Sequence, residues 1–223
     1  MSLLSKKNSM GCLIFARYNS KRLPGKVLKK IGNKTLLDIV YERAKKIFES
    51  KNIIVATSTA SSDNKISIHC IKNNYRFFRG DLNNVLLRAV SCLKKFKFTS
   101  VARICCDRPF FNYKELNLMI KKFETNKYDI ISNCYENKIP SGLTNEIVNG
   151  KILIKNFKKI TKKNHQEHMM NYFYQNSKLF KILAFETKYG KFQLSKNYSI
   201  DNYNDLKNAE KIINKHGYFH IIN

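Results

Sequence analysis

A segment near the amino end carries the residue types that a phosphate-binding loop needs. Residues 16–26 read Ala-Arg-Tyr-Asn-Ser-Lys-Arg-Leu-Pro-Gly-Lys and place four cations, Arg17, Lys21, Arg22 and Lys26, within ten consecutive residues. A triphosphate requires fixed positive charge and backbone N–H groups exposed by a tight turn. The segment lacks the G-x-x-x-x-G-K-[ST] pattern of a Walker A loop. Taken alone, it is explained equally well as a solvated basic turn.

The elements that must position this loop are predicted from the spacing of apolar residues. Short apolar runs predict buried strands, and apolar residues at helical spacing predict helices between them. The predicted strands span 10–16, 52–57, 75–78, 100–106 and 128–133, and the predicted helices span 34–49, 63–73, 82–96 and 113–124. Strands that alternate with helices predict an α/β fold, with a mainly parallel, Rossmann-like sheet and helices on both faces.

Polar segments follow several of the predicted strands. Residues 17–26, 79–81 and 107–109 lie at carboxyl ends of strands, where parallel sheets bind ligands, so we expect them to converge on one crevice. Beyond residue 133 the pattern is looser. It predicts loop and strand over 139–148, a helix over 165–176, strands over 180–186 and 198–200, and a closing helix over 203–215. Asp201 therefore follows a predicted strand, as Asp107 does.

The formal net charge of +26 indicates either a polyanionic partner or compositional drift toward lysine. We favour drift, because the lysines are dispersed in short groups, and so nucleic acid is not the expected partner. The six cysteines form no C-x-x-C pair and lie mostly in apolar segments, which fits a reducing, cytoplasmic compartment. We find no signal peptide and no apolar run of membrane-spanning length, so we expect no membrane partner.

The basic loop resembles the A-R-x-x-S-x-R-L-P-G-K signature of the CMP-sugar cytidylyltransferase family, in particular its spore-coat polysaccharide biosynthesis subgroup. The family is related to the 3-deoxy-manno-octulosonate and acylneuraminate cytidylyltransferases. The loop departs from the signature at Asn19, where Gly is usual, and at Lys21, where Ser or Thr is frequent. The positions that match are Arg17, Ser20, Arg22, Leu23, Pro24, Gly25 and Lys26.

Further segments resemble the same family in the same order along the chain. Residues 78–86 resemble F-R-G-x-x-x-x-V-L, and residues 103–109 resemble R-I-T-G-D-C-P. Residues 141–143 resemble D-G-L, and residues 167–173 resemble E-H-V-T-P-Y. The ending around 199–206 resembles W-T-V-D-T-x-E-D-L. Each piece is a weak signal, but the ordered set covers nearly the whole chain and is specific.

This resemblance implies a nucleotidyltransferase sheet of the nucleotide-diphospho-sugar transferase type. It implies a Mg²⁺-dependent transfer of CMP from CTP to an acidic sugar, with release of pyrophosphate, for surface polysaccharide biosynthesis. Arg17, Lys26 and Asp107 are the expected catalytic residues, and Asp107 and Asp201 are the expected Mg²⁺ ligands. The alternative for each aspartate is a helix N-cap, and the N-cap of the last helix is contested by Asn202.

The resemblance also divides the remaining site residues between two substrates. The expected nucleotide-binding residues are Ala16, Arg17, Ser20, Arg22, Gly25, Lys26, Ser58, Arg79, Gly80, Asp81 and Arg103. The expected acceptor-binding residues are Arg108, Asn133, Ser141, Glu146 and His168. Ser141 and Thr144 replace acids that are usual in the family, and Cys106 and Arg108 replace its Gly and Cys. The acceptor therefore stays open between an acidic sugar and a phosphorylated small molecule.

We expect one nucleotidyltransferase domain over residues 10–223, after a disordered segment 1–9. Residues 10–134 are expected to bind the nucleotide, residues 135–223 the acceptor, and the aromatic stretch 172–185 offers a possible homodimer contact. Three alternatives stay open: a nucleotidyltransferase with another base or a phosphorylated non-sugar acceptor, a basic nucleic-acid-binding protein, and a nucleotide binder without turnover. A glycosyltransferase is disfavoured, because no Asp-x-Asp motif follows the fourth predicted strand.

Overall fold

The computed structural model describes residues 9–136, 139–187 and 196–222. The expectation of disorder over residues 1–9 therefore lies outside the described residues, apart from Ser9. The Ser9 hydroxyl donates to the Lys97 carbonyl at 2.8 Å, and the Thr99 N–H donates to the Ser9 carbonyl, also at 2.8 Å. These two bonds tie the start of the first strand to the segment before the fourth predicted strand.

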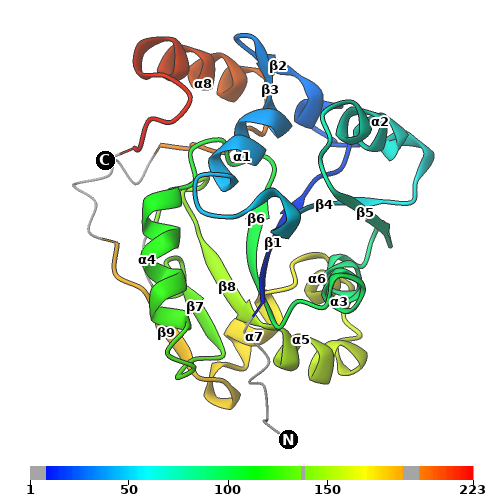
Figure 1. The fold of residues 1–223 in the computed structure, drawn as a ribbon, viewed down its shortest axis with the longest axis vertical. Coiled ribbons are helices and arrows are strands. Elements are labelled where there is room, and N and C mark those ends of the chain that lie inside the picture. Colours follow the sequence, from blue (N-terminus) through cyan, green and yellow to red (C-terminus); the bar gives the residue numbers. More distant parts are fainter. Residues whose placement is uncertain (1–8, 137–138, 188–195, 223) are drawn as a thin grey trace, which may run out of the picture.

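A seven-stranded sheet forms the centre of the molecule, in the order β5-β4-β1-β6-β8-β7-β9 (Figure 1). Strands β5, β4, β1 and β6 are parallel, β8 is antiparallel to both β6 and β7, and β9 is parallel to β7. The strands are β1 (Met10–Phe15), β4 (Ile53–Ser58), β5 (Phe77–Gly80), β6 (Ser100–Cys105), β7 (Ile130–Ser132), β8 (Glu146–Asn149) and β9 (Ile182–Ala184). The expected mainly parallel sheet is confirmed.

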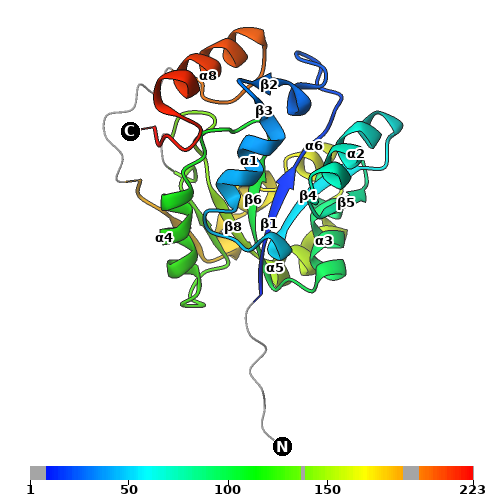
Figure 2. The ribbon, with the colours of Figure 1, turned by 45° about the horizontal axis from the view of Figure 1, so that its top comes forward.

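Helices cover both faces of this sheet, as predicted (Figure 2). Helices α1, α2, α4 and α8 contribute to one apolar cluster, and α3, α5 and α7 contribute to the other. The helices are α1 (Leu36–Ala44), α2 (Asn64–Lys72), α3 (Val85–Phe96), α4 (Tyr113–Phe123), α5 (Gly150–Asn156), α6 (Lys163–Glu167), α7 (Asn171–Gln175) and α8 (Tyr203–His216). A two-stranded ribbon, β2 (Lys30–Ile31) with β3 (Lys34–Thr35), lies beside α8 (Figures 1 and 2).

The two-residue period of β1 explains why one strand serves both clusters. Cys12 and Ile14 belong to the cluster with α1, and Leu13 belongs to the cluster with α3. All three side chains are fully buried. Successive side chains of a strand point to opposite faces, so a strand that is covered on both faces is apolar throughout.

Two expectations for the carboxyl-terminal part are wrong. The predicted helix over 165–176 is two short helices, because His168 leaves the helical conformation (φ −101°, ψ 71°) and Met169 and Met170 turn into the core. The predicted strand over 198–200 pairs with no strand among the described residues. Its backbone bonds singly instead, from the Tyr198 N–H to the Ser141 carbonyl and from the Ile200 N–H to the Asp107 carbonyl, each at 2.8 Å.

Gly142 allows the 198–200 segment to pass against the loop before β8. Its φ of +94° lies in the region that favours glycine. A Cβ at this position would lie 2.3 Å from the Tyr198 carbonyl carbon, so any side chain collides with backbone. Next to it, the Ser141 and Ser199 hydroxyls are hydrogen-bonded at 2.8 Å. The close approach is one of the contacts that bring Asp201 to the sheet.

We predict that Gly142→Ala lowers the free energy of unfolding by about 3 kcal/mol or more, because backbone strain and a backbone collision add. Gly217→Ala is the matched control, since Gly217 has a φ of +82° but a Cβ added to it would meet no atom within 4 Å. With its ψ of 166°, Gly217 lies in a region that is almost exclusive to glycine, so strain alone should cost about 1–3 kcal/mol, less than in Gly142→Ala. Urea denaturation measures both values, and equal losses would contradict the role of the close approach.

Candidate functional site

A cavity of about 420 Å³ opens at the carboxyl ends of β1 and β6. Nine of the residues predicted for the site line it, which is where a parallel sheet is expected to bind a ligand. These nine are Ala16, Arg17, Ser20, Arg22, Lys26, Arg103, Asp107, His168 and Asp201. The structure therefore brings together the basic loop, the end of β6 and the segment before α8.

The basic loop is shaped by a glycine turn that points one lysine inward. Gly25 has a φ of +69°, and its N–H donates to the Tyr18 carbonyl at 2.8 Å. The chain then enters a single 3₁₀ turn over Lys26–Leu28. Lys26 is only 9% exposed as a result, whereas Arg22 projects from the loop with 68% of its side chain exposed. Gly25 itself shapes the turn and is not among the residues that line the cavity.

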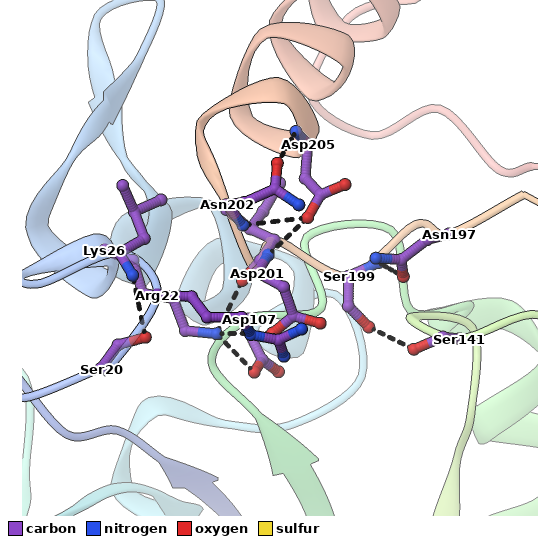
Figure 3. Close-up of polar contacts among 12 residues, drawn as sticks. Ser20, Arg22, Lys26, Asp107, Ser141, Asn197, Ser199, Asp201, Asn202 and Asp205 are labelled. Atoms are coloured by element: carbon purple, nitrogen blue, oxygen red, sulfur yellow. Dashed lines mark hydrogen bonds and ion pairs between the residues drawn. The ribbon is translucent and has the colours of Figure 1, made fainter.

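Lys26 holds the two predicted metal ligands together (Figure 3). Its ammonium nitrogen lies 2.9 Å from Asp107 Oδ2 and 3.3 Å from Asp201 Oδ1. It also donates to the Ile200 carbonyl at 2.6 Å. An ammonium has three N–H groups, so these three oxygens satisfy it completely. The Arg22 guanidinium adds a second cation, 3.0 Å from Asp201 Oδ1.

Neither aspartate caps a helix. Asn112 caps α4 and Asn202 caps α8, each by accepting from backbone N–H groups of the first turn. Asp107 lies in the turn that follows β6, and Asp201 lies just before the cap of α8. The Asp201 N–H donates to Asp205 Oδ2 at 2.9 Å, and this bond fixes the backbone that carries the carboxylate (Figure 3).

The two carboxylates fit a hard divalent cation. A single cation, the Lys26 ammonium, already contacts both of them, so their spacing suits one positive ion. Mg²⁺ in proteins is held by one or two carboxylates, with phosphate oxygens and waters completing its shell. Among the residues that the structure describes, no group of three or more His, Cys, Asp or Glu side chains forms a metal site.

One rim of the cavity is closed by an ion pair between distant segments. Arg17 of the basic loop lies 3.1 Å from Glu167 at the end of α6. Both side chains are about half exposed, at 53% and 45%, so solvent screens this pair and it contributes little stability. Because His168 follows Glu167, the break after α6 places a glutamate and a histidine together at the mouth.

Beneath the cavity, β6 and β8 carry a buried ion pair. Arg103 and Glu146 are opposite each other in the antiparallel register, and their side chains are paired. Tyr174 donates to the second Glu146 oxygen at 2.6 Å. Burial raises the pKa of Glu146, but the charges of Arg103 and Arg108 and the Tyr174 hydrogen bond outweigh it and hold that pKa below its usual value. Arg103 thus lines the cavity as a cation whose orientation Glu146 sets.

Besides Gly25, four predicted nucleotide-binding residues do not line the cavity. Arg79 donates to the carbonyls of Ser58 and Ala60, each at 2.9 Å, and the Ser58 hydroxyl bonds to Asp63 at 2.5 Å. Asp81 accepts from the backbone N–H groups of residues 83 and 84. Gly80 is packed against Phe78 and Arg88. A nucleotide-binding role for Ser58, Arg79, Gly80 and Asp81 stays a prediction.

The predicted acceptor residues other than His168 do not line the cavity. Asn133 is buried, and its amide donates to Glu115 at 2.5 Å and to the Leu143 carbonyl at 3.1 Å. Arg108 bonds to the Thr144 hydroxyl, so the arginine and the threonine that depart from the family pattern are partners. Ser141 bonds to Ser199. Direct acceptor contacts by Asn133, Ser141, Glu146 and Arg108 therefore stay predictions.

Arg88 is a cavity residue that the sequence analysis missed. It lies on α3, is almost fully buried, and donates to the carbonyls of Asp81, Ala56 and Leu82 at 2.9–3.2 Å. Burial lowers the pKa of its guanidinium. The signal was a single cation on the apolar face of the predicted helix 82–96. The other lining residues outside the predicted set are Phe15, Lys21, Val27, Val85, Cys105, Cys106 and Glu167.

Comparisons with known proteins agree with the resemblance carried by the basic loop. Residues 11–221 match the sequence profile of the cytidylyltransferase family. The chain is 33% identical to the spore coat polysaccharide biosynthesis protein SpsF of Bacillus subtilis, over 80% of this chain and 75% of that protein. It is also 33% identical to the 3-deoxy-manno-octulosonate cytidylyltransferase of Fusobacterium nucleatum, over 52% of this chain and 46% of that protein.

The fold agrees with a solved structure from the same family. A cytidylyltransferase from Leptospira borgpetersenii superposes with a TM-score of 0.88 and 26% identity, over 94% of this chain and 88% of that one. In the part of the chain that the structure describes, none of the helices combines the length and the apolar character needed to cross a membrane.

We predict that Glu146→Gln lowers the free energy of unfolding at pH 7 by about 3 kcal/mol or more, because it leaves Arg103 buried without a countercharge. Urea denaturation measures the loss. Glu42→Gln is the matched control, since Glu42 pairs with Lys34 at a partly exposed position, and it should cost about 1 kcal/mol or less.

The pH dependence of this loss has a definite sign. Glu146 has a lowered pKa in the folded protein, so its ion-pair stabilisation is fully present above the ordinary glutamate pKa of about 4.3 and is lost as pH falls through the folded value. The difference between the wild type and Glu146→Gln should shrink below that pH. A difference that stays constant into acid would contradict the ion-pair explanation.

Proposed function

Because the chain belongs to the cytidylyltransferase family, we propose that it is a Mg²⁺-dependent enzyme that transfers CMP from CTP to an acidic sugar and releases pyrophosphate. The single observation that carries this proposal is the meeting of Asp107 and Asp201 at Lys26, on the floor of a cavity edged by the basic loop. Two carboxylates and a row of cations are the two charge types that a metal–triphosphate complex requires.

The proposed reaction requires the protein to neutralise the negative charge of the phosphates, and it requires no covalent intermediate with a side chain. The hydroxyl oxygen of the acceptor bonds to the α-phosphorus of CTP and its proton passes to solvent, while the bond from phosphorus to the bridging oxygen breaks and negative charge builds on the departing pyrophosphate. Arg17, Lys21 and Arg22 edge the cavity where they can pair with phosphate oxygens. Asp107 and Asp201 would hold Mg²⁺, which when bound supplies further positive charge to the phosphates.

The acceptor proposed for this chain is an acidic sugar used in surface polysaccharide synthesis. Two relatives support it through their names, one a spore coat polysaccharide biosynthesis protein and the other a 3-deoxy-manno-octulosonate cytidylyltransferase. The cavity supports it through Arg103 and His168, which line it on the side of β6 and α6. An arginine held by Glu146 offers a fixed partner for an acceptor carboxylate.

Two further proposals concern the setting of the enzyme. All six cysteines are free thiols, which supports a reducing, cytoplasmic compartment. The second is a homodimer through the stretch 172–185, within which Leu179 is 70% exposed. Sedimentation at several protein concentrations would test this contact.

We predict that Asp107→Asn lowers pyrophosphate release about a thousandfold or more, because it removes a charge that holds the metal while the amide oxygen still accepts from Lys26. The assay supplies CTP, Mg²⁺ and a panel of acidic sugars, and it follows pyrophosphate. Circular dichroism should show an unchanged fold.

Asp129→Asn is the matched control for this variant. Asp129 precedes β7, which runs in the same direction as β6, so it lies at the edge of the sheet opposite the cavity. Its variant should keep wild-type turnover. Undiminished pyrophosphate release by Asp107→Asn would count against the metal role and against the proposed reaction.

We predict that CTP with Mg²⁺, at about 100 times its dissociation constant, stabilises the protein by about 2.7 kcal/mol, or about 5–10 °C in Tm. ATP, GTP and UTP are the controls and should shift Tm less, which separates a cytidylyltransferase from an enzyme that uses another base. DNA retention that falls steeply with salt, without any nucleotide-dependent shift, would favour nucleic-acid binding instead.

A further inference from the structure

The Lys26 ammonium occupies the position of a cation between two carboxylates. All three of its N–H groups are directed at oxygens, those of Asp107, Asp201 and the Ile200 backbone, within 2.6–3.3 Å. The side chain is almost fully buried, and the two aspartates keep 29% and 24% of theirs exposed. The ammonium therefore sits beneath the carboxylates, which face the cavity over it.

In the ligand-free protein, this contact supplies the positive charge that a bound metal ion would supply between the two carboxylates. Two carboxylates close together repel each other, and a shared cation relieves that repulsion. The contact also joins segments that are 81 and 175 residues from Lys26 in the chain. The Ile200 N–H bonds to the Asp107 carbonyl at 2.8 Å, so the same two segments are joined through their backbones as well.

Lys26 contacts one oxygen of each carboxylate that would hold the metal. Asp107 Oδ2 and Asp201 Oδ1 both accept from the ammonium, and Asp201 Oδ1 is also 3.0 Å from Arg22 (Figure 3). A cation that binds these oxygens must compete with Lys26 for them. When a binding site is open only part of the time, the apparent affinity falls by the fraction of time that it is open.

We propose that Lys26 is a built-in counterion that competes with the divalent metal for Asp107 and Asp201 in the nucleotide-free protein. The inference rests on the proposed metal role of the two aspartates and adds a function for the lysine. The lysine keeps the site assembled without metal, and it weakens metal binding until its ammonium has moved away.

The test measures metal binding without nucleotide, so it does not depend on turnover. Mn²⁺ serves as the probe, and the free ion is followed by electron paramagnetic resonance. Lys26→Met removes the competing ammonium and should bind Mn²⁺ about tenfold or more tightly than the wild type. Its metal-free Tm should fall below that of the wild type and should rise with Mn²⁺ by more than the wild-type Tm does.

Two further variants serve as controls for the Lys26→Met result. Lys21→Met removes the same charge from the same cavity, and Lys21 has no ion pair among the described residues, so its Mn²⁺ affinity should change by less than about twofold. Lys26→Gln retains a donor for the carboxylates if the methionine variant fails to fold, and it should also bind Mn²⁺ more tightly than the wild type.

The outcomes separate this inference from the proposed function. If the Lys26 variants bind Mn²⁺ no more tightly than the wild type, the inference is overturned. If Asp107→Asn loses Mn²⁺ binding in the same assay, the proposed metal site still holds. Equal gains in Lys21→Met and Lys26→Met also overturn it, because general charge would then explain the effect. If Asp107→Asn leaves Mn²⁺ affinity unchanged in the Lys26→Met background, the metal site of the proposed function fails, and the inference fails with it.

Discussion

The structure depends on an electrostatic constraint: two carboxylates from opposite halves of the chain must share one small volume. Asp107 follows β6 and Asp201 precedes α8, and the Lys26 ammonium binds both. Without a shared cation, their repulsion would push the two segments apart. The basic loop, the end of β6 and the approach to α8 therefore form one electrostatic unit, although each belongs to a different part of the sequence.

Backbone contacts bring these groups within reach of one another. The Cys106 N–H bonds to the Phe15 carbonyl, and the Ile200 N–H bonds to the Asp107 carbonyl, so the segments are joined beside their charges. Gly142 lets the 198–200 segment pass against the loop before β8. The backbone therefore holds the two carboxylates close together before any ligand binds, and preorganisation of that kind favours catalysis by electrostatics.

The antiparallel strand β8 determines how the charged side chain of Arg103 is held at the β6 side of the cavity. By pairing with β6 in antiparallel register, it sets Glu146 opposite Arg103 and fixes a guanidinium at the cavity wall. Tyr174 and Arg108 surround the same carboxylate and keep its charge. Arg108 and its partner Thr144 are two of the positions at which the chain departs from the family pattern.

The sequence alone determined the strands 10–16 and 100–106, the basic loop after the first and the aspartate after the second, because local apolar runs and turn residues encode them. It also carried the ordered motifs that identify the family. The tertiary structure decided that Lys26 points inward. It also decided that single hydrogen bonds, and not a strand ladder, join the segment before Asp201 to the rest of the fold. Ser58, Arg79 and Asp81 bond to groups outside the cavity lining. It likewise placed Arg88 at the cavity. The physical reason is that the partner of a side chain depends on packing between distant segments, which the spacing of neighbouring residues does not encode.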